Sequence, residues 1–193
     1  MKTLTIALAG TALALGACHQ NDAQNNTTLN DVAINDVTAN DSGNMTNMAA
    51  PTPTTAQGFV NAAAASDKFE IEGSKLAAAN AQSSAVKSFA RQMISAHTQS
   101  TAKLKSTISG ITPSIAPDDT LTPDQQSTLT SLQGKKGADF DSAYAAAQVD
   151  AHQKTLDALN GYAAGGDNPK LQDFAKQMIP IVTGHLNTAK GLK

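Results

Sequence analysis

The sequence predicts an all-α fold, a bundle of four long helices arranged as two antiparallel helical hairpins with one longer crossover that carries a short extra helix. Aromatic residues make up 4% of the chain and Trp is absent, so the core must consist of small aliphatic side chains, which suit close helix packing. Apolar stripes recur every three or four residues. The hexapeptide Phe-Ala-Arg-Gln-Met-Ile at 89–94 returns as Phe-Ala-Lys-Gln-Met-Ile at 174–179, which indicates two similar halves.

The first 55 residues are expected to lie outside the bundle. Residues 1–17 have the basic start, apolar run and small final residues of a signal peptide. They end before Cys18, the single cysteine, in a pattern that resembles the lipobox of bacterial lipoproteins, in which this cysteine is lipidated. The alternative is an ordinary secretory signal with an incidental cysteine. By the same resemblance, His19 indicates sorting to the outer membrane. Residues 18–55 are rich in Asn and Asp and predict a disordered tether.

The bundle is expected over residues 56–192, and its first hairpin joins helices at about 55–80 and 83–109, with Ser83 or Ser84 as the second N-cap. The expected buried stripe of the first helix contains Phe59, Ala62, Ser66, Phe69, Gly73 and Leu76. The stripe of the second contains Val86, Ala90, Met93, His97, Leu104 and Ile108.

The second half follows a crossover that begins at Gly110 and carries a short helix at about 122–132, opened by Thr122 and Pro123. A helix at about 139–164 has two overlapping apolar faces, one through Val149 and Leu156 and the other through Tyr144 and Gln148. The last helix, at about 169–189, has Asn168 as its N-cap and is expected to bend at Pro180.

Three of the four histidines, all but His19, fall on apolar stripes of three different helices. Side chains from facing helices converge in bundle cores, and imidazoles with one carboxylate suit zinc, copper, nickel or iron. The helix registers agree to within about one turn. The candidate metal ligands are Glu70, His97, His152 and His185, with Tyr144 and Gln148 as a supporting polar network.

Other kinds of site compete with this hypothesis or are disfavoured. The same side chains can form a buried hydrogen-bond network without metal. A di-iron centre is disfavoured because Glu70 and Glu72 are the only glutamates and no Glu-x-x-His occurs. A net charge of −2 and a pI near 6.0 argue against nucleic-acid binding. Neither a phosphate-binding loop nor a nucleophile elbow is present, which makes an enzyme the less favoured interpretation.

Residues along the whole bundle region together form a recognisable pattern: Phe59, Ala63, Phe69 to Ile71, Gly73, Leu76, Ala77, Val86 to Ile94, His97, Phe140, Asp141, Tyr144, Gln148, His152, Leu171, Phe174, Ala175, Pro180, His185 and Leu186. By this pattern the bundle region resembles the bacterial envelope family known as domain of unknown function 4142. The resemblance implies a ferritin-like four-helix bundle in an exported protein with no established activity. The family commonly has an acidic residue just before the histidine of the second helix, and here that residue is Ala96.

The combined prediction is a non-enzymatic, exported envelope protein that is anchored by lipid on the periplasmic side of the outer membrane. Two alternatives stay open. The bundle could bind a transition metal through its core histidines, or it could be an interaction module that recruits another envelope protein.

Overall fold

The computed structural model describes residues 53–192, and these fold into five α-helices without a strand. The helices are α1 (Ala56–Asn80), α2 (Ser84–Ile108), α3 (Pro123–Gln133), α4 (Gly137–Gly165) and α5 (Pro169–Lys190). The all-α prediction is confirmed, and each helix begins and ends within two residues of its predicted bounds. The signal peptide, Cys18 and the 18–55 tether lie outside the described residues, apart from the last three residues of the tether.

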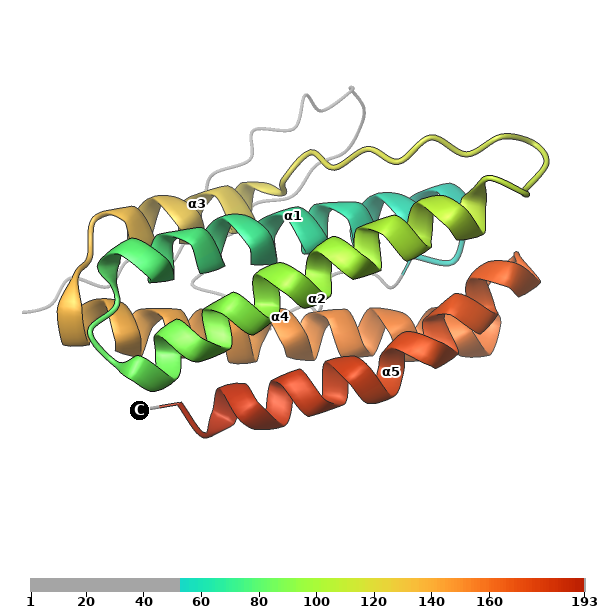
Figure 1. The fold of residues 1–193 in the computed structure, drawn as a ribbon. Helices are drawn as coiled ribbons and strands as arrows, with labels where there is room; N and C mark the ends of the chain where they lie inside the picture. Colours follow the sequence, from blue (N-terminus) through green and yellow to red (C-terminus); the bar gives the residue numbers. More distant parts are fainter. Residues whose placement is uncertain (1–52, 193) are drawn as a thin grey trace, which may run out of the picture. The chain divides into compact units, whose positions relative to one another are not determined.

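The four long helices lie side by side as two hairpins, α1 with α2 and α4 with α5 (Figure 1). The hairpins meet where α1 packs against α4 and α2 packs against α5. The crossover runs back along α1 to α3, as the yellow segment of Figure 1 shows. It is held there by a hydrogen bond of 2.7 Å from Gln57 to the Ala116 carbonyl and an ion pair of 3.1 Å between Lys68 and Asp119.

The apolar core is divided into two clusters. One contains Phe59 stacked on Tyr162, with ring centroids 4.1 Å apart, and includes Phe174. The other contains Phe89 and Tyr144 with their neighbours. Along each long helix, the residues of the two clusters are separated by buried polar positions. We call these positions the central polar layer, and its members are Asp67, Glu70, His97, Gln148, His152 and His185.

The buried faces of α1 and α4 differ from the stripes expected from sequence. In α1, Ala62 is exposed and Ser66 and Leu76 are only half-buried, while Ala64 and Ala65 are buried. Of the two overlapping faces of α4, the one through Tyr144 and Gln148 is buried completely, and Val149 and Leu156 are only half-buried. The reason is that α4 contacts both α1 and α5, so the face directed between these two helices carries its most enclosed residues.

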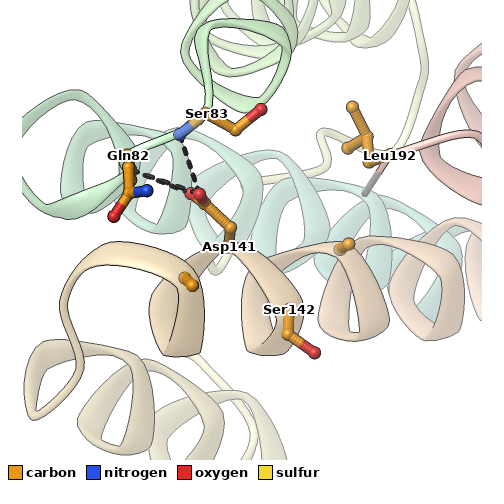
Figure 2. Close-up of a pocket in the computed structure, with 7 residues that line it drawn as sticks. Gln82, Ser83, Asp141, Ser142 and Leu192 are labelled. Atoms are coloured by element: carbon orange, nitrogen blue, oxygen red, sulfur yellow. Dashed lines mark hydrogen bonds between the residues drawn. The ribbon is translucent and has the colours of Figure 1, made fainter.

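The turn between α1 and α2 is held by a carboxylate of α4. Ser83 occupies the predicted N-cap position of α2, but its side chain makes no capping bond. The Asp141 carboxylate instead accepts the backbone N–H of Ser83 at 2.7 Å and that of Gln82 at 3.1 Å (Figure 2). This contact lines a surface hollow of about 540 Å³ that also borders Ser142 and Leu192.

No helix of the described part of the chain is long and apolar enough to cross a membrane.

We expect Asp141→Ala to lower the free energy of unfolding by about 2–3 kcal/mol, because the substitution leaves two partly buried N–H groups without their charged acceptor. Urea unfolding of the variant and the wild type measures this difference. Ser142→Ala is the matched control, since Ser142 is exposed beside the same hollow, and a change of less than about 0.5 kcal/mol is expected there. Equal effects of the two substitutions would contradict the role assigned to Asp141.

Candidate metal centre

All four long helices contribute to the central polar layer. Helix α1 supplies Asp67 and Glu70, and α2 supplies His97. Helix α4 supplies Gln148 and His152, and α5 supplies His185. These side chains are at most 8% exposed. Because apolar clusters lie on both sides of the layer along the bundle, its polar groups must find their partners within it.

The three histidines converge, as their positions on the helices predict. One ring nitrogen from each lies within 4.8 Å of a ring nitrogen from each of the other two. The ring centroids are 5.8 Å apart for His97 and His152, 5.9 Å for His97 and His185, and 5.6 Å for His152 and His185. Three imidazoles on one zinc ion, with Zn–N near 2.0–2.1 Å, have centroids roughly 5 to 5.5 Å apart. Shifts on the order of 1 Å would therefore close the rings onto an ion.

Hydrogen bonds orient two of the rings and fix their tautomers. His97 donates from Nδ1 to the Asp67 carboxylate at 2.8 Å, and His152 donates from Nδ1 to the Gln148 carbonyl at 2.8 Å. In the neutral rings each bond leaves a lone pair on Nε2, and both Nε2 atoms are buried without a hydrogen-bond partner in the described chain. The Nδ1 atom of His185 is buried and unpartnered in the same way.

The two carboxylates of α1 lie behind the rings of His97 and His152. Asp67 is bonded to Nδ1 of His97 and also accepts the hydroxyl of Thr101 at 3.0 Å. Glu70 Oε1 is 3.6 Å from Nδ1 of His152, and neither oxygen of Glu70 has a hydrogen-bond partner among the described residues. Glu70, the predicted fourth ligand, is thus placed beside the histidine cluster and is not among the three converging groups.

The two residues predicted to support the site have different partners from those expected. The Tyr144 hydroxyl is hydrogen-bonded to Ser74 at 2.7 Å and to none of the histidines. Gln148 holds His152 through its backbone carbonyl, while its side-chain Oε1 is buried without a partner. In the conformation described, the central polar layer therefore does not satisfy itself as a closed hydrogen-bond network.

Burial and neighbouring charges set the protonation of the layer. Burial lowers the pKa of His152 and that of His185 to about 4, so both rings are neutral at pH 7. Burial also lowers the pKa of His97, but the hydrogen bond to Asp67 and the charge of Glu70 more than offset this, and the net shift is upward. Burial raises the pKa of Glu70 to about 7. Neutral imidazoles are the form that binds metal.

Asp67 is the one member of the layer that the sequence reasoning missed. It lies between Ser66 and Lys68 in a polar stretch, and no apolar stripe passes through it. The available signal was its spacing of three residues from Glu70, which places both carboxylates on one face of α1. Ala96 stands just before His97, where the family resemblance leads us to expect an acidic residue. In this chain the carboxylate that contacts His97 comes instead from Asp67, on a different helix.

We expect Glu70→Gln to stabilise the metal-free protein at pH 8 more than at pH 5. The folded pKa is about 7, raised from 4.5, so the unfolded chain releases this proton first and the wild type loses stability as the pH rises from about 4.5 to 7. Gln has no such proton. The stability gained by the variant should therefore grow by about 2–3 kcal/mol between pH 5 and 8. Urea unfolding in the presence of a chelator measures it.

The matched control for this comparison is Glu72→Gln, the other glutamate of α1, which lies outside the central polar layer. A gain from Glu70→Gln that is the same at both pH values would show that the Glu70 carboxyl titrates in the folded protein as it does in water.

Comparison with known proteins places the chain in a family. The family model described as domain of unknown function DUF4142 matches residues 42–192, a range that contains all five helices and the central polar layer. No curated protein and no solved structure matches the chain, so the ferritin-like relationship stays a prediction. The chain belongs to the DUF4142 family.

Proposed function

We propose that this protein binds a transition-metal ion through His97, His152 and His185. The observation that carries the proposal is the convergence of three histidines from three helices, each with a buried ring nitrogen that has no hydrogen-bond partner in the described chain. A buried polar atom left without a partner costs about 1–3 kcal/mol, and a metal ion would satisfy all three nitrogens at once.

The hydrogen bonds support metal binding over a purely structural network. When both rings are neutral, Nδ1–H donation by His97 and His152 leaves only acceptor lone pairs on their Nε2 atoms, so these two nitrogens do not satisfy each other. Metal-binding histidines almost always donate their second ring N–H to a carboxylate or a backbone carbonyl. Asp67 provides a carboxylate of this kind and Gln148 provides a carbonyl.

The ligand set and its burial indicate a binding role in place of catalysis. Nitrogen ligands suit zinc, copper, nickel and iron, and the three converging groups include no thiolate. A catalytic metal needs an open position that a substrate can reach. The surface hollows beside Asp141 and beside Val149 are lined by none of the three histidines. The ion would therefore be held within the bundle, as in a carrier, sensor or structural site.

We also propose that the protein is exported and anchored by lipid at Cys18, on the periplasmic side of the outer membrane. The support is the signal-like sequence of residues 1–17, the lipobox-like pattern that ends in Cys18, and His19 after it. An envelope location exposes a protein to metal ions from outside the cell, which is compatible with the core site.

Elemental analysis of the natively purified full-length protein tests metal binding. We expect close to one equivalent of a transition metal in the wild type, and an affinity at least about 100-fold lower in His152→Ala and in His185→Gln. Gln153→Ala is the matched control, because Gln153 is exposed next to His152 and its side chain bonds only to Asp157. Circular dichroism verifies that each variant is folded. A wild type that takes up no metal after incubation with zinc, copper(I), nickel and iron(II) would refute the proposal.

The anchor has its own test. We expect Cys18→Ser to release the protein from the membrane fraction and to abolish the mass increase due to lipid, because the serine hydroxyl does not replace the thiol that carries it. Fractionation and mass spectrometry of the mature protein provide both readouts. A wild-type protein of unmodified mass, or a variant that stays in the membrane fraction, would contradict the lipoprotein assignment.

A further inference from the structure

We infer that Asp67 and Glu70 make the histidine site selective for divalent over monovalent ions. The inference rests on the proposed metal binding and deepens it, because it names the charge class of the ion and the residues that determine it. It gives α1 a function in the site although none of the converging nitrogens belongs to that helix.

The first step is the charge of the core. The described residues bury three carboxylates, those of Asp67, Glu70 and Asp141, and bury neither a lysine nor an arginine. Asp141 lies at the end of the bundle, where two backbone N–H groups bind it. Asp67 and Glu70 remain, two carboxylates beside three imidazoles with no buried lysine or arginine in the described chain. Without an ion, only protons held by Glu70 and His97 offset their charge. A divalent cation balances both.

The second step is the position of these two charges. Asp67 Oδ1 is 2.8 Å from Nδ1 of His97, and Glu70 Oε1 is 3.6 Å from Nδ1 of His152. Each carboxylate is thus close to the Nδ1 atom of its ring, while the Nε2 atom of the same ring has no hydrogen-bond partner in the described chain. An ion at these Nε2 atoms would lie roughly 7 Å from the Asp67 carboxylate and within about 8 Å of the Glu70 carboxylate, close enough for a substantial Coulomb attraction in a buried setting. The carboxylates would act on the ion through space and through the imidazoles, as positioning residues.

The third step is the contrast between ions of different charge. Three neutral imidazoles alone accept either copper(I) or a divalent ion such as zinc, so the ring nitrogens do not choose between charges. Coulomb energy is proportional to the charge of the ion. A carboxylate therefore contributes half as much binding energy for a monovalent ion as for a divalent ion. If it raises the affinity for the divalent ion by a given factor, it raises the affinity for the monovalent ion by only the square root of that factor.

The test compares zinc(II) and copper(I) affinities of the full-length wild type, Asp67→Asn and Glu70→Gln, by competition with chelators under anaerobic conditions. Both substitutions remove a charge and keep a side-chain oxygen, so the amide introduced by Asp67→Asn can still accept the His97 N–H. We expect each to lower zinc affinity roughly 10- to 100-fold. Copper(I) affinity should fall by the square root, roughly 3- to 10-fold, and the zinc preference should fall by the same ratio.

The matched control is Glu72→Gln, which removes one negative charge from α1 outside the central polar layer, and neither affinity should change by more than about 2-fold. Equal losses for the two ions would show that the carboxylates act through geometry alone and would overturn this inference while metal binding stands. Unchanged affinities for both ions would overturn it as well. Failure of the wild type to bind either ion would instead overturn the proposed function.

Discussion

The need to satisfy polar groups in the middle of an apolar bundle governs this structure. Each long helix has apolar residues toward both of its ends and one short polar interval between them. Because a helix slid by one turn would place these polar groups against apolar neighbours, the layer fixes the relative register of all four helices. The same enclosure lowers the pKa of His152 and His185 and raises that of Glu70. The enclosure of polar groups between apolar clusters therefore determines both the register of the helices and the protonation of the central polar layer.

The sequence predicted the helices and the meeting of the histidines because both depend on periodicity. Helices are signalled locally, by caps such as Thr122 and Asn168 and by apolar stripes with a period of 3.6 residues. Counting residues from the turns was then enough to place His97, His152 and His185 at similar levels of the bundle. The directions of individual side chains were not predictable in this way. The position of Glu70 behind His152, and the pairing of Asp67 with His97, depend on rotamers and on how α1 lies between α2 and α4. No pattern within one helix contains that information.

The repeated hexapeptide describes the two halves better than it describes the site. Phe89 and Phe174 are both buried, and the two segments have equivalent places in α2 and α5. The histidines do not share this equivalence, since His97 follows its phenylalanine by two turns and His185 by three. His97 has a carboxylate at Nδ1, whereas Nδ1 of His185 is unpartnered in the described chain. A duplicated scaffold thus holds three histidines, each of which has a different environment.

Helix α1 contributes charge to the central polar layer and contributes none of its converging nitrogens. In the proposed site, geometry and electrostatics would belong to separate segments of the chain: three helices would determine where an ion lies, and the fourth would determine the potential at that position. An amide in place of either carboxylate would alter that potential and keep an oxygen beside the histidine ring. In such an arrangement ion preference can drift during evolution through two positions of one helix, while the coordination geometry stays the same.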